Sequence, residues 1–269
     1  MAHILISSPG QGGLFKINLE NKKQFRICSG NIRGISTMDN SFVYVQGNKN
    51  SVFDMNQKEL FSFNGNSSLH DVKFFKCKFY IMSTEEKKML TFTYEGGFLN
   101  ELKFDNCYWP NCCLIDPVTE NVIIFLSAKR PYSKSKIICC TKDLVFLWEY
   151  YCLEGDEIHS PFLVGDTLFW CRSNYNSIVK ASLSKQLRDI RKVIINNGGY
   201  VRGLCIHDDK LYLGTSENRH AATSLCTSEF NCGCIHSYFL HNDSYAFDDM
   251  ITLPVKEVYD IVYYDKDPI

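Results

Sequence analysis

One short phrase recurs along this chain: an apolar strand that opens on a polar or charged residue, then a turn, then a second apolar strand. Its six copies open at Arg33, His70, Asn111, His159, Arg202 and Asp260. The intervals between these openings are 37, 41, 48, 43 and 58 residues. Repeats of about 40–50 residues, each with about four short strands, are typical of a β-propeller. The phrase therefore predicts an all-β propeller whose six openings surround a central channel.

The sixth copy has no second strand after it, and this predicts how the ring closes. Counted across the chain ends, the interval from Asp260 to Arg33 is 42 residues, which fits one more repeat split between the termini. A strand at about Val258–Tyr264 would then complete a blade with three N-terminal strands at about His3–Ser7, Gly13–Asn18 and Gln24–Cys28. Such a shared blade leaves no free sheet edge. We expect six blades, with five or seven as the error range, in one domain over residues 1–269.

Helical patterning is almost absent. The one candidate, Ser184–Lys192, is polar and too short to be stable alone, so we interpret it as a loop or a strand edge. Elsewhere, short runs rich in Val, Ile, Phe and Tyr alternate with turn residues. This pattern favours antiparallel sheet throughout.

Composition limits the class of partner. The formal net charge of −1 gives no reason to expect nucleic acid or an anionic membrane as partner, because both favour a basic surface. Hydrophobic residues at 45% and aromatic residues at 14% argue against disorder. The apolar run at residues 1–6 is too short for a secretory signal, and no run reaches the roughly 18 residues of a membrane span. We expect a soluble, cytoplasmic protein.

The chain has 13 cysteines, an odd and high number. Without an export signal a disulfide framework is not expected, and a reduced cysteine serves as a small hydrophobic residue. Seven of them lie in apolar strand-like runs and are predicted to be reduced core thiols: Cys77, Cys112, Cys113, Cys139, Cys140, Cys171 and Cys205.

Short segments of the repeats resemble those of a known family. The segments are His70-Asp71-Val72, Asn106–Asn111, His159-Ser160-Pro161-Phe162, Arg202-Gly203-Leu204, Gly214–Arg219 and Cys232-Gly233. They resemble the His-Glu-Leu, Arg-Cys-His-Leu-Asn-Gly, His-Ser-Pro-Arg-Trp, Arg-Gly-Leu, Gly-x-Ser-x-x-Arg and Cys-Gly segments of a largely bacterial family of uncharacterised, propeller-like proteins. Asp replaces Glu at position 71, and the third segment lacks its Arg-Trp end. The resemblance spans about residues 30–240 and implies a propeller, while the family has no established reaction.

The first residues of the repeats form the predicted site. Arginine suits carboxylate, phosphate or sulfate, so Arg33 and Arg202 are expected to bind a small anion, with Asn111 beside them. Histidine transfers protons near neutral pH, which makes His70 and His159 the candidate acid and base. Asp71 or Asp260 would orient one of these histidines. The alternative is a structural ring in which polar side chains bond only to one another and to trapped water.

Two sets of residues could hold a metal ion. Asn111, Asp71 and Asp260 offer oxygen ligands, and His70–His159–Asp260 could hold zinc or iron, but arginines nearby would compete for the carboxylates. We therefore favour a site without metal or organic cofactor. The second set is a zinc alternative outside the channel: Cys226, Cys232, Cys234 and His236. Its C-x-C spacing is less common than C-x₂₋₄-C, and cysteine packing is the preferred interpretation.

The loop after the fifth copy is a candidate lid over the channel. Its charged residues Glu217 and Arg219 are expected to help bind substrate, because long loops on rigid scaffolds commonly carry function. Arg219 or His220 could also lower the pKa of Cys232 or Cys234.

The sequence thus favours an enzyme that acts on a small anionic metabolite. Its reaction would be a histidine-mediated proton transfer, namely an isomerisation, elimination or hydrolysis. The alternative is a non-catalytic propeller that binds a protein or a ligand.

Overall fold

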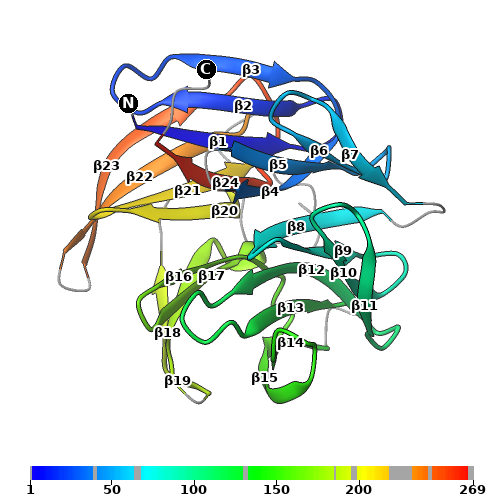
Figure 1. Ribbon diagram of the computed structural model, residues 1–269. Coiled ribbons are helices and arrows are strands. Elements are labelled where there is room, and N and C mark those ends of the chain that lie inside the picture. Colours follow the sequence, from blue (N-terminus) through cyan, green and yellow to red (C-terminus); the bar gives the residue numbers. More distant parts are fainter. Residues whose placement is uncertain are drawn as a thin grey trace.

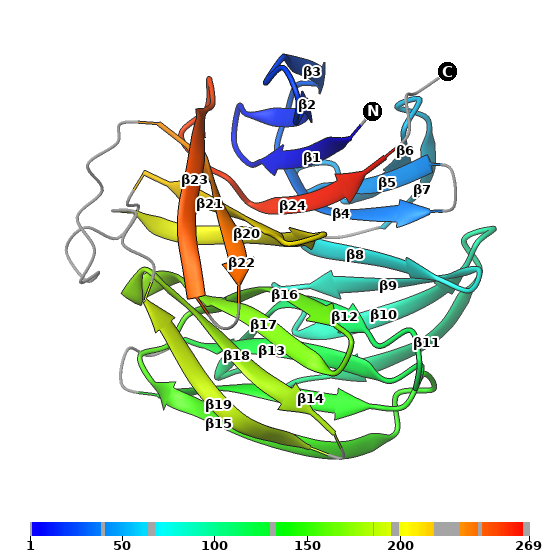
Figure 2. The same ribbon diagram turned by 90° about the vertical axis from the view of Figure 1, so that its left-hand side faces the viewer.

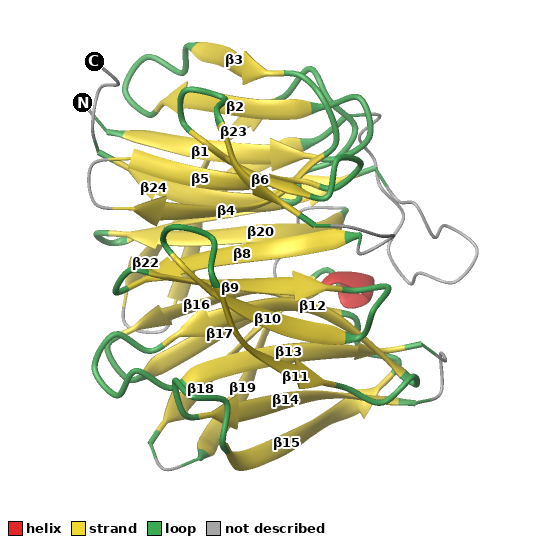
Figure 3. Cartoon of the chain, turned by 45° about the vertical axis from the view of Figure 1, so that its right-hand side comes forward, coloured by secondary structure: helices red, strands yellow, loops and turns green. Residues whose placement is uncertain are grey.

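The computed structural model describes residues 2–38, 41–63, 68–129, 133–184, 186–194, 199–217, 232–241 and 244–265. Over these residues the chain forms 24 β-strands and one 3₁₀ helix, η1 (Ser173–Tyr175). The strands make six four-stranded sheets, and the cartoon is almost entirely strand (Figure 3). The sheets are the six blades of a propeller, as the repeats predicted.

The blades are named A to F, and each is given from its innermost strand outward. Blade A consists of β24 (Asp260–Tyr264), β1 (His3–Ser8), β2 (Gly13–Asn18) and β3 (Gln24–Cys28). Blade B consists of β4 (Ile32–Met38), β5 (Ser41–Gln46), β6 (Ser51–Asp54) and β7 (Glu59–Ser62). Blade C consists of β8 (Leu69–Phe75), β9 (Lys78–Ser83), β10 (Lys88–Thr93) and β11 (Phe98–Lys103). Blade D consists of β12 (Tyr108–Ile115), β13 (Val122–Ala128), β14 (Lys134–Cys140) and β15 (Phe146–Glu154). Blade E consists of β16 (Ile158–Val164), β17 (Thr167–Arg172), β18 (Ser177–Leu183) and β19 (Leu187–Ile194). Blade F consists of β20 (Tyr200–His207), β21 (Lys210–Ser216), β22 (Cys234–His241) and β23 (Ser244–Thr252).

Blade A closes the ring with strands from both ends of the described chain. β24 pairs antiparallel with β1, from Asp260 opposite Ser7 to Tyr264 opposite His3, and the two lie side by side in Figure 1. This confirms the split blade predicted from the unpaired sixth copy. Figure 2 shows the inner strands β24, β4, β20 and β8 across the middle, with β3, β15 and β19 at the outside.

The segment predicted as a loop or strand edge contains most of β19, the outermost strand of blade E. Within the described ranges, the structure has no helix with the length and apolar character needed to cross a lipid bilayer.

Six hydrophobic cores hold the blades together, one at each junction between neighbours. Trp170, the largest fully buried side chain, packs at the D–E junction with Phe125. Six of the seven cysteines predicted as core residues are buried in or beside these cores. The exception is Cys77, which is exposed because it lies in the β8–β9 turn, with a φ of 61°. The core prediction was wrong for Cys77.

The start of each innermost strand is irregular in five blades. The register of the inner pair shifts by one residue at Arg33-Gly34, His70, Asn111, Ser160-Pro161 and Arg202-Gly203. A β-bulge bends the strand and redirects a side chain. These bulges occur at or beside the polar residues that open the five repeats. The side chains of these residues therefore do not follow the strict alternation between the two faces of the sheet.

Candidate functional site

The inner strands of blades A, C, D, E and F surround a small cavity. Its lining residues are Asp71, Lys73, Asn111, Cys112, His159, Ser160, Pro161, Arg202, Tyr259 and Asp260. A volume of about 20 Å³ is open to the centre of a water molecule, which is room for about one water. Five predicted ring residues therefore line one cavity, whereas Arg33 and His70 are not part of its lining.

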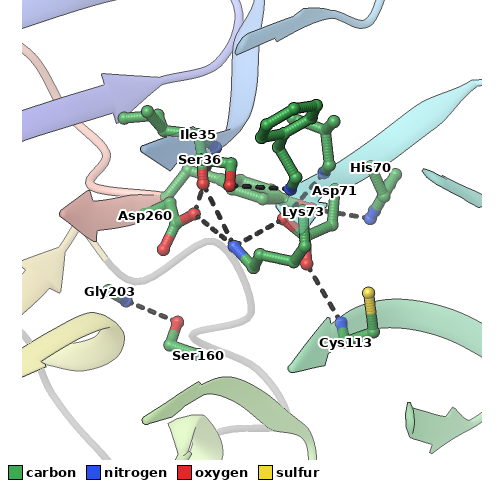
Figure 4. A network of polar contacts seen from close by, with 12 residues as sticks. Ile35, Ser36, His70, Asp71, Lys73, Cys113, Ser160, Gly203 and Asp260 are labelled. Atoms are coloured by element: carbon green, nitrogen blue, oxygen red, sulfur yellow. Dashed lines mark hydrogen bonds and ion pairs between the residues drawn. The ribbon is translucent and has the colours of Figure 1, made fainter. Parts of the chain in front are cut away.

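Lys73 lies between two carboxylates at the wall of this cavity (Figure 4). Its ammonium is 3.0 Å from Asp71 Oδ1 and 3.3 Å from Asp260 Oδ2, and it donates to the Ile35 carbonyl at 3.1 Å. Burial raises the pKa of Asp71 to about 6, although Lys73 opposes this shift. Burial lowers the pKa of Lys73, but the two carboxylates outweigh it and raise that pKa overall. The sequence analysis missed Lys73, although a residue two positions after Asp71 on a strand shares its face.

Three residues on alternate blades each hold the inner strand of the next blade (Figure 4). The bonds are Ile35 N to Asp260 Oδ2 (3.2 Å), Cys113 N to Asp71 Oδ2 (3.0 Å) and Gly203 N to Ser160 Oγ (2.8 Å). Each acceptor is the second residue of its repeat. The first residue is therefore His70 in the second copy, His159 in the fourth and Tyr259 in the sixth. Ser160 thus stands where the other two positions have a carboxylate. Neither Asp71 nor Asp260 bonds to an imidazole within the described part of the chain.

Arg202 is a buried cation at the cavity wall, with 8% of its surface exposed. Its guanidinium lies over the Tyr259 ring, 3.9 Å from the centroid, and its Nε has no hydrogen-bond partner among the described residues. Burial lowers the pKa of Arg202, while Tyr259, Tyr200 and the Glu257 carboxylate raise it and prevail. The position predicted for an anion-binding arginine therefore holds an unsatisfied buried donor.

His70 and Tyr259 form a hydrogen-bonded pair beside Arg202. The His70 Nδ1 and the Tyr259 hydroxyl are 2.7 Å apart, with the rings edge to face. Burial, with smaller contributions from Arg33 and Arg202, holds the pKa of His70 well below its usual value, so its ring is neutral at pH 7. Burial raises the pKa of Tyr259 to about 12. Tyr259 was missed because the sixth copy was aligned one residue late, on Asp260.

His159 is fixed at both ring nitrogens. Its Nε2 is 3.1 Å from Asn111 Nδ2, and its Nδ1 is 2.8 Å from the Ser173 hydroxyl. Asn111 also donates to Ser127 Oγ at 2.7 Å. This chain of bonds holds the imidazole in one orientation at the cavity wall.

The remaining predicted residues lie away from the cavity. Arg33 donates to the Ser68 hydroxyl at 2.9 Å and to the Leu69 carbonyl at 3.4 Å. Glu217 forms an ion pair with Lys256 at 3.0 Å, in a separate surface pocket that also includes Glu257. Arg219 and His220, in the predicted lid, are outside the described residues.

The zinc alternative is described only in part, since Cys226 lies outside the described residues. The sulfurs of Cys232 and Cys234 are 4.0 Å apart, while His236 Nε2 is 3.1 Å from the Thr215 hydroxyl. In the described part of the chain, no group of three or more His, Cys, Asp and Glu residues is arranged to hold a metal ion.

Replacing His70 with asparagine is expected to weaken the pH dependence of stability. The folded ring stays neutral, whereas an unfolded histidine takes up a proton below about pH 6.5, so acid favours the unfolded state. Between about pH 6 and about pH 5, the wild-type free energy of unfolding should fall more steeply than that of His70→Asn, by about 1 kcal/mol per pH unit. Urea unfolding at several pH values measures both slopes. The exposed His241→Asn is the control, and equal slopes for His70→Asn and wild type would contradict a neutral buried ring.

Comparison with known proteins gives the fold alone. No protein-family model matches the chain, and no curated protein is significantly similar. A protein of unknown function from Bacteroides caccae matches with a TM-score of 0.70 at 12% identity, over 98% of this chain and 99% of that one. A chain of a nidogen/laminin complex matches with a TM-score of 0.72 at 11% identity, over 98% of each chain. Regucalcin from Agrobacterium tumefaciens, a calcium-binding protein, matches with a TM-score of 0.63 at 11% identity, over 85% of this chain and 76% of that one. At these identities, the chain shares with them the architecture of a β-propeller.

Proposed function

We propose that this chain binds a small, singly charged anion in the cavity and acts on it by proton transfer. The observation that carries the proposal is the buried Arg202, whose Nε lacks a hydrogen-bond partner in the part of the chain that the structure describes. Burying a charged donor is costly unless it is paired. Arginine N–H groups form strong, directional bonds with carboxylates. A bound anion would satisfy the guanidinium.

The charges around the cavity favour a single negative charge on the ligand. The cations that line the cavity are Lys73 and Arg202, and both carboxylates of the lining, Asp71 and Asp260, lie against Lys73, which leaves Arg202 as the one positive charge for a ligand. At the third equivalent position the hydroxyl of Ser160 brings no charge, so the side of the cavity near Arg202 is the one where an anion is favoured.

The size of the cavity favours a compact anionic group. About 20 Å³ suits a group close in size to a water molecule. A carboxylate, with three heavy atoms, comes closer to this limit than phosphate or sulfate, which carry four oxygens around a larger central atom. We therefore infer that the ligand is a small monocarboxylate, or a metabolite that inserts its carboxylate here.

His70 and Tyr259 are the proposed proton-transfer pair. Tyr259 lines the cavity and keeps its proton because burial raises its pKa, so it can donate a proton to the ligand. The neutral His70 ring bonds to the Tyr259 hydroxyl from outside the lining and acts through it. His159 is the second candidate for proton transfer, and its ring is held in one orientation by hydrogen bonds with Asn111 and Ser173. In this proposal Asp71 and Asp260 position the inner strands rather than the histidines. An isomerisation, elimination or hydrolysis would need no organic cofactor.

A protein-binding module is the second candidate, because blade D has an apolar outer edge. Phe146, Tyr151 and Leu153 on β15 are 58%, 50% and 63% exposed. Exposed apolar patches on a soluble protein often mark docking sites.

The likeness to a Bacteroides caccae protein of unknown function supports the further proposal that the chain belongs to an uncharacterised propeller group.

The test is stabilisation by simple anions. Formate or acetate at about 100 times its Kd should stabilise the wild-type protein by about 2.7 kcal/mol, raising Tm by about 5–10 °C, whereas sulfate should do less. Arg202→Gln should lose this response, and the exposed Arg188→Gln should keep it. Failure of formate and acetate to stabilise the wild type, or retention of the response in Arg202→Gln, would overturn the proposal.

A second variant keeps the test informative if Arg202→Gln unfolds. Ser160→Asp adds the third carboxylate beside Arg202, and aspartate tolerates the left-handed φ of 52° at this position. We expect this variant to have a raised Tm and no response to formate, because its own side chain takes the place of the ligand. A full formate response in Ser160→Asp would contradict the assigned anion position.

A further inference from the structure

Two cysteines have neighbouring sulfurs where β22 begins: Cys234 is its first residue, and Cys232 lies two positions before it. The sulfurs of Cys232 and Cys234 are 4.0 Å apart. Cys232 is partly exposed, and Cys234 is buried. No part of the proposed anion site includes either thiol.

The backbone between the two cysteines is held in place. Gly233 donates its N–H to the Val255 carbonyl and accepts from the Leu253 N–H at 2.9 Å. A Cβ at position 233 would lie 3.1 Å from the Val255 oxygen and 3.4 Å from Val258 Cγ2. Glycine therefore allows this close approach, which keeps the two flanking thiols together.

We propose that Cys232 and Cys234 are a reversible dithiol–disulfide site. A disulfide needs an S–S distance of about 2.05 Å, so the sulfurs must approach by about 2 Å from their present separation. A bridge between residues i and i+2 closes a small ring and is strained. Strained disulfides have more oxidising potentials and are readily reduced, which is the behaviour of regulatory rather than structural bridges.

The oxidant in this proposal is a small disulfide such as oxidised glutathione. The accessible Cys232 attacks it as a thiolate, forming a mixed disulfide and releasing one glutathione thiol. Cys234 then attacks the Cys232 sulfur, forms the internal bond and releases the second glutathione thiol. Two protein thiols are oxidised and one glutathione disulfide is reduced, and the two protein protons end on the two glutathione thiols. Burial raises the pKa of Cys234 to about 12, which makes it the less reactive of the two thiols and leaves the first attack to Cys232.

The experiment is a glutathione redox titration of the folded full-length chain, followed by alkylation and peptide mass mapping. In the wild type, oxidised glutathione should protect two thiols from alkylation and yield a peptide with Cys232 bridged to Cys234. Dithiothreitol should restore both thiols. Cys234→Ser should stop at the mixed disulfide on Cys232, and Cys232→Ser should lose the bridge.

Two control variants separate this site from other thiols. Cys77→Ser/Cys107→Ser removes two exposed cysteines and should leave the bridge intact. Cys226→Ser removes the nearest cysteine in sequence outside the described residues and should also leave it intact. The proposal is overturned if both thiols stay alkylatable at every glutathione ratio. It is equally overturned if the mapped bridge joins Cys226 to either partner.

Discussion

Replacing Lys73 with methionine is expected to lower the free energy of unfolding at pH 7 by about 3–5 kcal/mol. The variant keeps a side chain of similar length but leaves the buried Asp71 carboxylate and the partly buried Asp260 carboxylate without their shared cation. Removing one partner of a buried ionic group leaves uncompensated charge, which costs far more than a surface ion pair contributes. Urea unfolding of wild type and variant measures the difference.

The sign of the pH dependence makes this prediction specific. Without Lys73, which opposes the effect of burial, the folded-state pKa of Asp71 rises further above its unfolded value, so the folded state binds more protons and the variant regains stability as the pH falls towards about 4. Adding Asp71→Asn to Lys73→Met should recover part of the loss at pH 7, because one buried charge is removed. The exposed Lys58→Met is the matched control and should change stability by less than about 0.5 kcal/mol. A Lys73→Met variant as stable as the wild type at pH 7 would show that the carboxylates do not depend on the ammonium.

Ending the chain after Val258 is expected to abolish cooperative unfolding. This removes β24, which pairs with β1 along five residues and closes blade A. It also removes Ile261 from the F–A core and Tyr264 from the A–B core. Each of these buried side chains contributes about 1.5–3 kcal/mol, and the lost strand pairing adds to this, so the total approaches the 5–15 kcal/mol by which whole domains are stable.

Circular dichroism and size-exclusion chromatography would detect this loss, as a broad unfolding transition and an expanded or aggregated chain. The control chain ends after Asp265, keeps β24 and should unfold like the full-length protein. If the chain ending after Val258 unfolds cooperatively at a similar midpoint, blade A does not need its inner strand and the closure described above is not required for stability.

The fold was predictable because it depends on repeated local patterns. The interval between strand openings and the alternation of apolar residues with turns predicted six blades, and the unpaired sixth copy predicted the pairing of β24 with β1. Cys77 shows where such reasoning fails. An apolar neighbourhood in sequence says little about a turn residue, whose exposure is decided by backbone geometry.

The sequence predicted several residues that line the cavity, but not which side chains contact one another. Asn111, His159 and Arg202 line the cavity as expected from the first positions of their repeats. The sequence did not indicate that Lys73 engages both carboxylates, or that Tyr259 bonds to His70. The Lys73–Asp260 and Tyr259–His70 contacts join residues 187 and 189 positions apart, and they depend on where the inner strands direct each side chain.

The split composition of blade A also has a consequence for synthesis on the ribosome. β1 is translated about 250 residues before β24, its partner. At about 5–20 residues per second, that delay is roughly 13–50 s. Throughout it, β1 offers an unpaired edge to any nascent or neighbouring chain, and the A–B and F–A cores lack one wall. The speed of the ribosome therefore sets a lower limit on how soon this protein can finish folding, and chaperones that cover strand edges would act during that interval.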